Sequence, residues 1–156
     1  MSAPPALLQP LRQLLGDASL VAERLPGTDL TLWLIDAQNM DRAFSPEETR
    51  RILEEPPYWC FCWASGLAMA RWLVEQPHWV QGKRVLDFGA GSGVAAIAAA
   101  RAGAAEVVAC DLDPLALQAC RENAALNGVS LGYSADFFAE ADRFDLILVA
   151  DVLYDR

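Results

Sequence analysis

Histidine is scarce in this sequence, which has only His78, and its four cysteines are Cys60, Cys62, Cys110 and Cys120. A single histidine excludes histidine-rich metal sites and argues against a Ser-His-Asp triad. Cys60 and Cys62 form a C-x-C pair without a nearby histidine, which is a poor zinc pattern. We therefore predict no metal site and four reduced thiols.

Positive charge is also scarce, because 12 Lys and Arg residues stand against 21 Asp and Glu residues, for a formal net charge of −9. Sequence-independent nucleic-acid binding needs a basic surface, so no nucleic-acid partner is expected. No apolar run reaches the roughly 18 residues of a membrane-spanning helix. The sequence start also lacks the basic region and apolar stretch of a signal peptide. No membrane partner is expected, and the predicted location is cytoplasmic.

Glycine, in contrast, is concentrated in one place. Gly89, Gly91 and Gly93 alternate directly after a short apolar run and a carboxylate, Asp87, and an alanine-rich run without glycine or proline follows at 94–102. This order predicts a strand, a tight turn and a helix, in which glycine lets a ligand approach the main chain closely. The free N–H groups at the start of the helix would point at that ligand.

The charge beside the turn indicates which ligand fits. The dinucleotide fingerprint is G-x-G-x-x-G, whereas here the third glycine comes one residue early. Asp87 would repel a pyrophosphate but attract an ammonium or sulfonium group. S-adenosylmethionine carries both cations, and we therefore expect this cofactor rather than a dinucleotide.

Alternating strand and helix patterns predict an α/β fold. The β-α-β-α-β order implies a parallel sheet with right-handed crossovers, whose ligands bind beyond the carboxyl ends of the strands. The strands are expected at 84–88, 106–110, 130–134 and 144–150, and the connecting helices at 94–102 and 113–127.

An aspartate stands at or just after each predicted strand end, at Asp87, Asp111, Asp136 and Asp151. Asp111 follows Asp87 by 24 residues, a distance at which an acidic residue can accept hydrogen bonds from both ribose hydroxyls. One such aspartate is often only a helix cap, but four in this register indicate a cationic ligand. Asp136 and Phe137 could bind and cover an adenine, or form a plain turn.

Residues 1–56 form a predicted N-terminal extension of helices and one strand, ahead of the cofactor-binding half at 57–156. The extension either packs on the core or takes part in substrate recognition. Its expected elements are a helix over Leu7–Leu15, a short helix over 19–25, a strand over 30–36, a loop over 37–44 and a helix opened by a Ser45–Glu48 capping box.

The most aromatic stretch of the chain follows this extension, at 58–66. It contains Trp63, for which two interpretations remain open. The ring either plugs the core or lines the mouth of the ligand site, where an aromatic face attracts a sulfonium or ammonium group.

The string Asp-x-Gly-x-Gly-x-Gly at 87–93 resembles motif I of the seven-strand (class I) methyltransferases, and residues 58–154 are similar to the cofactor half of that class. The Asp151-x-x-Tyr154 sequence resembles the D-x-x-Y/F motif that marks a group of protein-lysine methyltransferases. Within this group, the Ala-Ser-Gly-Leu-Ala and Gly-Ser-Gly-Val-Ala-Ala-Ile-Ala-Ala-Ala runs are similar to the lysine methyltransferases of the electron-transfer flavoprotein β-subunit.

The resemblance implies a Rossmann-like three-layer αβα parallel sheet and a protein-lysine methyltransferase that uses S-adenosylmethionine and has a lysine-bearing protein as its partner. It assigns Asp151 and Tyr154 to the acceptor, although Tyr154 is also suited to a core position at a strand end. In a eukaryote, it would also place the protein in the mitochondrial matrix. The implied cofactor-binding residues are Trp63, Asp87, Gly89, Gly91, Gly93, Asp111, Leu112, Asp136 and Phe137.

The sequence departs from the class because it stops just after the fourth strand, so that strands 5 to 7 are missing. We expect either a fragment or a partner chain that supplies this half, with self-association through the exposed edge of the fourth strand. Three alternatives remain for function. They are a small-molecule methyltransferase, a methyltransferase of a ribosomal protein with a similar glycine loop and Asn-Ala-x-x-Asn helix, and an inactive chain that binds the cofactor or dimerises.

Overall fold

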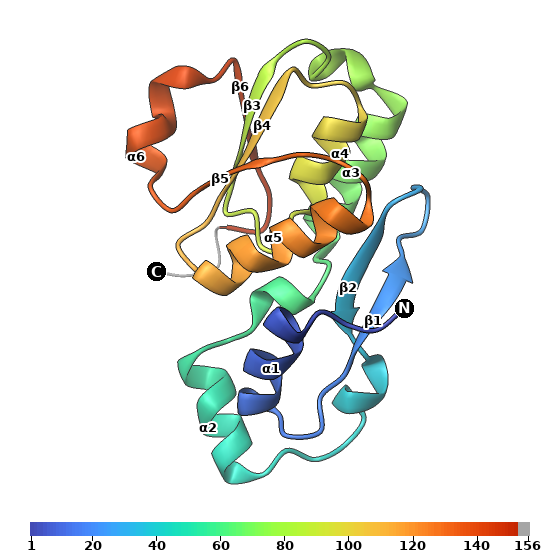
Figure 1. Cartoon of the computed structure of the whole chain (residues 1–156), viewed down its shortest axis with the longest axis vertical. Helices are drawn as coiled ribbons and strands as arrows, with labels where there is room; N and C mark the ends of the chain where they lie inside the picture. Colours follow the sequence, from blue (N-terminus) through green and yellow to red (C-terminus); the bar gives the residue numbers. More distant parts are fainter. Residues whose placement is uncertain (153–156) are drawn as a thin grey trace.

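The computed structural model describes residues 1–152 of the chain, and Tyr154 lies outside the described residues. The described part contains a two-stranded antiparallel sheet and a four-stranded parallel sheet. Figure 1 shows the parallel sheet in one half of the molecule and helices α1 and α2 in the other, with α5 between them. Within the described residues, no helix has the length and apolar character needed to cross a membrane.

The parallel sheet has the strand order β5-β4-β3-β6. Every neighbouring pair in it is parallel. This arrangement confirms the predicted α/β class. The observed bounds of the first two strands equal the predicted ones, whereas β5 and β6 are shorter than predicted. The strands are β3 (Arg84–Phe88), β4 (Glu106–Cys110), β5 (Gly132–Ser134) and β6 (Leu146–Val149).

Helices cover both faces of this sheet. Helix α4 (Val94–Arg101) packs on β3, β4 and α3 (Ala64–Glu75), and its small alanine side chains allow that close approach. On the opposite face, Phe137 of α6 (Phe137–Glu140) packs on Leu86 and its neighbours. The layers are therefore helix, sheet and helix. The cover is thin over edge strand β6, where Ile147 is 40% exposed.

The N-terminal part consists of α1 (Pro5–Leu14), β1 (Leu20–Arg24), β2 (Thr31–Ile35) and α2 (Pro46–Glu54). The Ser45–Glu48 capping box at the start of α2 is confirmed, because each residue's side chain accepts a hydrogen bond from the other's main-chain N–H. The described residues also contain four short 3₁₀ helices: η1 (Ala37–Met40), η2 (Tyr58–Cys60), η3 (Pro77–Trp79) and η4 (Ala141–Arg143). The first of these lies in the predicted loop at 37–44.

The helix predicted over 19–25 is wrong, because this segment forms strand β1. Gly27, with φ +76°, helps to reverse the chain, and β1 then pairs with β2 from Leu20 opposite Ile35 to Arg24 opposite Thr31. Only Leu20 of β1 is buried. The strand therefore carries no alternating apolar pattern, and its pairing with β2 overrides its local helical propensity.

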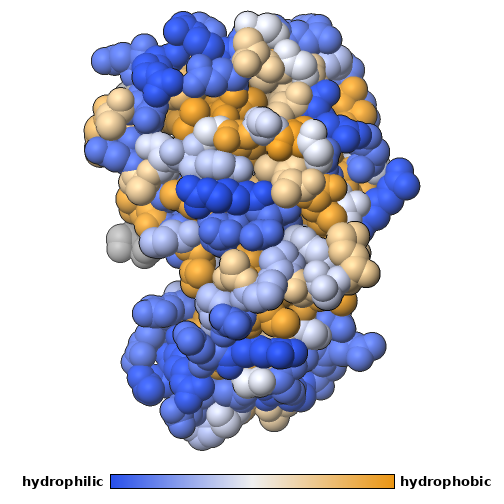
Figure 2. All heavy atoms as spheres, in the orientation of Figure 1, coloured by the Kyte–Doolittle hydropathy of each residue, from blue (hydrophilic) through white to orange (hydrophobic). Residues whose placement is uncertain are grey.

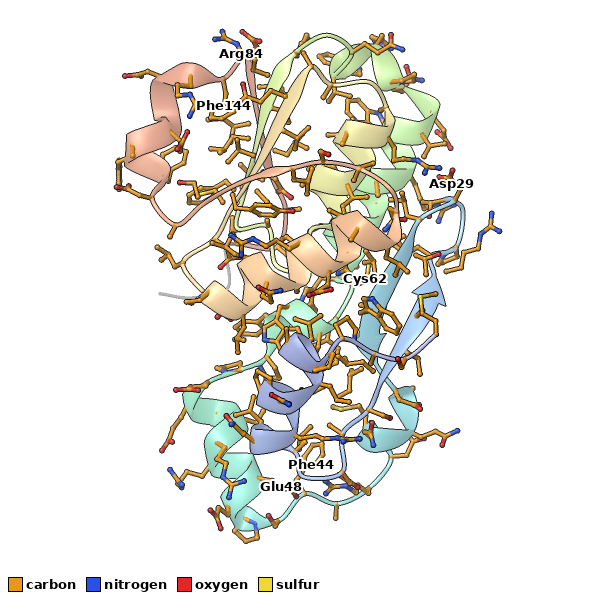
Figure 3. The ribbon with its side chains drawn as sticks, viewed as in Figure 1. Asp29, Phe44, Glu48, Cys62, Arg84 and Phe144 are labelled. Carbon is orange, nitrogen blue, oxygen red and sulfur yellow. The ribbon has the colours of Figure 1, made fainter. Side chains whose placement is uncertain are left out.

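The β1–β2 hairpin docks on the helices of the other half. Asp29 lies at the hairpin tip (Figure 3). It forms an ion pair with Arg101 of α4. Trp33 of β2 lies in a core shared with Trp59 and with Ala116 of α5 (Pro114–Leu126). Away from this core, Figure 2 shows mostly hydrophilic residues on the surface around α1 and α2. The N-terminal part is thus anchored to the helix that follows β4.

Candidate functional site

A cleft of about 1350 Å³ opens at the carboxyl ends of the four parallel strands. The segments that directly follow the strands line it, and the end of α2 and the aromatic stretch supply further lining. The strand-end segments are 89–92, 111–116, 135–138 and 150–152, and the other lining residues include Glu55, Pro56, Pro57, Tyr58, Trp59 and Trp63.

The glycine turn forms the floor of this cleft between β3 and α4. Gly89, Gly91 and Gly93 all have positive φ angles, of 72°, 56° and 83°. A Cβ atom on Gly91 would meet nothing within 4 Å, so the main chain there is open to a ligand. A Cβ atom on Gly93 would instead lie 3.0 Å from the Cys120 sulfur, so this glycine allows α5 to pack on the turn.

Asp87, at the end of β3, is buried rather than open. It is 2% exposed, and its Oδ2 atom accepts a hydrogen bond of 3.0 Å from the Ala96 N–H in the first turns of α4. Burial raises the pKa of Asp87 to about 7, and the charge of Asp111 acts in the same direction against the Ala96 hydrogen bond. Asp87 thus holds α4 on the sheet. Its carboxyl group is only partly ionised near neutral pH.

Asp111, just after β4, organises the turn from the opposite side. Its Oδ2 atom accepts a hydrogen bond from the Gly91 N–H at 2.9 Å, and its Oδ1 atom accepts one from the Asp113 N–H at 2.9 Å. A carboxylate oxygen has two acceptor sites, so each oxygen retains capacity for a hydroxyl donor. Asp111 is therefore a turn-holding residue that can also bind a ribose.

The segment after β5 begins a helical turn. The Oδ1 atom of Asp136 accepts hydrogen bonds from the N–H groups of Phe138 and Ala139, so this side chain caps α6. The ring of Phe137 packs edge-on against Phe88, with centroids 4.8 Å apart. Asp136 and Phe137 both line the cleft, as does Leu112, whose side chain is 88% exposed.

Asp151 follows β6 in an unusual backbone conformation. Among the described residues it alone, apart from glycines, has a positive φ, of 56°. Its Oδ2 atom accepts a hydrogen bond of 3.0 Å from the Gly66 N–H in the first turn of α3. Asp151 thereby caps α3 from a distant part of the chain and lines the cleft beside the glycine turn.

The aromatic stretch divides between core and cleft. Trp59 is the ring buried in the core, at 1% exposure, whereas Trp63 is 43% exposed and lies in the cleft wall. Its Nε1–H donates to the Tyr58 carbonyl at 3.1 Å, and its ring contacts Phe61 with centroids 5.3 Å apart. These contacts fix the Trp63 ring against the cleft.

The described residues that line the cleft include no Lys, Arg or His. A cleft with this lining has a negative potential that favours a cationic ligand over a phosphate. Sequence reasoning missed two of its carboxylates. Asp113 is the first residue of the helix expected at 113–127 and carried no predicted ligand role, and Glu55 belongs to no recognised motif. The acidic lining residues are Glu55, Asp87, Asp111, Asp113, Asp136 and Asp151.

Residues 70–155 match the family model of PrmA, the ribosomal protein L11 methyltransferase. The chain belongs to this family. It is 44% identical over 103 residues to the electron transfer flavoprotein beta subunit lysine methyltransferase of Danio rerio, a match that covers 64% of this chain and 40% of that protein. It is 47% identical over 91 residues to the ribosomal protein L11 methyltransferase of Symbiobacterium thermophilum, covering 54% and 29%. The predicted resemblance to the lysine methyltransferases of the electron-transfer flavoprotein β-subunit is therefore confirmed, and the chain is also similar to ribosomal protein L11 methyltransferases.

Solved structures support the same fold. The ribosomal protein L11 methylase of Lactobacillus delbrueckii subsp. bulgaricus is 36% identical with a TM-score of 0.50, over 57% of this chain and 47% of that one. A 16S rRNA methyltransferase of T. thermophilus, solved with AdoMet and guanosine, is 24% identical with a TM-score of 0.57, over 85% and 32%. The chain spans about two fifths of the length of its lysine methyltransferase relatives.

Proposed function

We propose that the chain binds S-adenosylmethionine in the acidic cleft and forms the cofactor-binding part of a protein methyltransferase whose acceptor is a lysine side chain. The observation that carries the proposal is the charge of the cleft. Its lining contains carboxylates and none of the described lining residues is basic. A dinucleotide pyrophosphate would be repelled there, whereas a sulfonium and an ammonium group would be attracted. Membership of the methyltransferase family supports the same cofactor.

The lining residues fit this cofactor in shape as well as charge. The open main chain at Gly91 would admit the methionine part, and the spare acceptor sites of Asp111 would bind the ribose hydroxyls. Phe137 and Leu112 would give the adenine an apolar wall. Bound S-adenosylmethionine supplies an electrophilic methyl group on a positively charged sulfur.

Alignment and deprotonation of the lysine acceptor would depend on residues beside the methyl group. A lysine amine must be aligned with the methyl group and must be neutral, and alignment supplies much of the rate of such a displacement. Asp151 has a carboxylate at the cleft with further acceptor sites beyond its Gly66 hydrogen bond, so it would orient the amine and receive its proton. Trp63 would exclude water and contact the lysine ammonium before it gives up its proton.

Two acceptors follow from the relatives. The first is the electron-transfer flavoprotein β-subunit, supported by the matches over 64% of the chain. The second is ribosomal protein L11, supported by the family match. The lysine methyltransferase and L11 methyltransferase relatives are both considerably longer than this chain. The methyl-transfer activity of this chain, as well as the identity of its acceptor, is therefore part of the proposal.

Two measurements test the proposal. Calorimetric titration with S-adenosylmethionine should show saturable binding, and no binding at millimolar cofactor would contradict it. Incubation with the tritiated-methyl cofactor and either purified acceptor should then label a lysine of one of them. If neither acceptor is labelled, the same incubation is repeated with a cell lysate, and label confined to its small molecules would support a small-molecule methyltransferase instead. Binding without any transfer would contradict the catalytic half of the proposal.

A further inference from the structure

A buried amide on α5 joins the glycine turn to the N-terminal hairpin. Asn123 is 0% exposed. Its Oδ1 atom accepts a hydrogen bond of 2.8 Å from the Trp33 N–H of β2, and its Nδ2 atom donates one of 2.8 Å to the Ser92 carbonyl of the turn. One side chain outside the cleft therefore contacts both the hairpin and the ligand-facing turn.

Asn127 lies one helical turn after Asn123, at the C-cap of α5. Its side chain forms hydrogen bonds with the hairpin but none with the glycine turn. Its Oδ1 atom accepts from the Thr31 N–H at 3.0 Å, and its Nδ2 atom donates to the Thr31 carbonyl at 2.6 Å. With Asn123, it supplies the hydrogen bonds that a further strand would give to the free edge of β2. The two asparagines thus hold the hairpin in similar ways, and only Asn123 also holds the turn.

The glycine turn needs such contacts, because glycine peptides with positive φ angles lose much conformational entropy when they are fixed. Asp111 holds the Gly91 N–H, and the Gly93 N–H donates to the Ala90 carbonyl at 2.8 Å. The Ser92 carbonyl belongs to the same peptide group as the Gly93 N–H. Asn123 therefore fixes the second end of that peptide and with it the orientation of the turn.

We propose that Asn123 is a positioning residue for the cofactor, and that the β1–β2 hairpin contributes to cofactor affinity through it. The part of this inference that concerns cofactor affinity rests on the proposed function, namely that the chain binds S-adenosylmethionine. Loss of the Asn123 contact would leave the turn free to adopt other conformations, so that the cofactor would have to order it on binding. One lost net hydrogen bond predicts a decrease in affinity of roughly three- to tenfold.

Asn123→Ala and Asn127→Ala form a matched pair, because each leaves two main-chain groups of the hairpin or turn without a partner. The melting temperature should fall in both. Amide hydrogen exchange of the cofactor-free chain over 89–95 should rise severalfold in Asn123→Ala only, and the dissociation constant for S-adenosylmethionine should rise in the same variant. If either alanine variant does not fold, the corresponding serine variants replace the pair, because water can enter the smaller polar site.

Amide hydrogen exchange and cofactor affinity test the role of Asn123 and the proposed function separately. Equal exchange of the turn in both variants, at equal loss of melting temperature, would overturn the positioning role whether or not the cofactor binds. Faster exchange in the Asn123 variant with unchanged cofactor affinity would overturn the link to the cofactor. Failure of the wild-type chain to bind S-adenosylmethionine would contradict the proposed function, while the exchange measurement would still decide whether Asn123 orders the turn.

Discussion

Asp151 accepts a hydrogen bond through its Oδ2 atom from the Gly66 N–H, at 3.0 Å, although 85 residues separate the two. The contact joins the end of β6 to the first turn of α3, and it holds a carboxylate at the mouth of the cleft. It also gives Asp151 two separable properties. The oxygen that caps the helix is structural, whereas the negative charge is what an amine acceptor would use.

Substitutions of Asp151 should separate these properties. Asp151→Asn retains a side-chain oxygen for Gly66 and tolerates the positive φ, so stability and cofactor affinity should stay close to wild type while methyl transfer is lost. Asp151→Ala loses the cap and also places alanine at a positive φ, so the free energy of unfolding should fall by about 1–2 kcal/mol. Thermal melting, cofactor calorimetry and methyl transfer to the acceptor check the three effects. Full transfer activity in the Asn variant would refute a role for the charge.

Asp111 should control cofactor affinity rather than transfer. Asp111→Ala removes both the ribose acceptor and the hydrogen bond to Gly91, so we expect the dissociation constant for S-adenosylmethionine to rise by roughly tenfold or more. Asp113→Ala is a matched control, because it also removes a carboxylate from the cleft. The wild-type Asp113 side chain caps α5 by accepting from the Leu115 N–H and does not hold the glycine turn. Equal losses of affinity in the two variants, measured by calorimetry, would mean that only the total charge matters.

Much of the fold could be predicted because buried parallel strands have short apolar runs bounded by turns. The runs that start at Val85 and Val107 identified β3 and β4 with their observed bounds. Strand β1 could not be identified this way, because its only buried residue is Leu20 and its stability comes from pairing with β2. Long-range pairing of this kind leaves little trace in a local pattern.

The site was predictable in position but not in detail. Parallel topology brings strand ends together, and on that basis the aspartates at these ends were expected at one edge of the sheet. The hydrogen-bond partners of Asp87 and Asp151 are N–H groups of helices α4 and α3, and such partners depend on how helices pack. The same limit applies to Trp59 and Trp63, because only tertiary packing decides which ring of one aromatic run is buried.

The pKa of Asp87 makes stability depend on pH in a definite direction. Burial raises this pKa from 3.8 in the unfolded chain to about 7 in the folded protein, so the folded state binds more protons between these values. Stability from this group should therefore be greatest at acid pH and should decrease as pH rises from about 4 to 7. Asp87→Asn should remove that decrease, measured by urea unfolding at pH 5 and pH 8. A slope that persists in the Asn variant would assign it to another group.

Two carboxyls with lowered pKa values, Glu48 and Asp145, act in a different pH range from Asp87. Hydrogen bonds from Arg42 and Arg84 lower the pKa values of Glu48 and Asp145 to about 2. These two groups stabilise the protein above their ordinary pKa values, and their stabilisation is lost as pH falls below about 4.5 towards 2. The effect of Asp87 between pH 5 and pH 8 should therefore be measurable without interference from them.

Cofactor binding should also release protons through Asp87. A sulfonium in the cleft favours the ionised carboxylate, so at pH 7 binding should release up to about half a proton from this residue. Calorimetric titration in two buffers of different ionisation enthalpy measures this number directly. The release should be absent in Asp87→Asn. An equal release in the variant would show that the protons come from elsewhere.

Glycine substitutions should distinguish backbone strain from obstruction of the cleft. Gly91 and Gly82 have positive φ angles, of 56° and 69°, and open space where a Cβ atom would lie, but only Gly91 lines the cleft. Gly91→Ala and Gly82→Ala should each lower the free energy of unfolding by about 1–2 kcal/mol, because alanine is strained in this conformation. Only Gly91→Ala should also weaken S-adenosylmethionine binding, since its methyl group would stand where the ligand approaches the main chain. Comparable cofactor affinity in the two variants, measured by calorimetry below their melting temperatures, would show that the ligand does not approach the turn at Gly91.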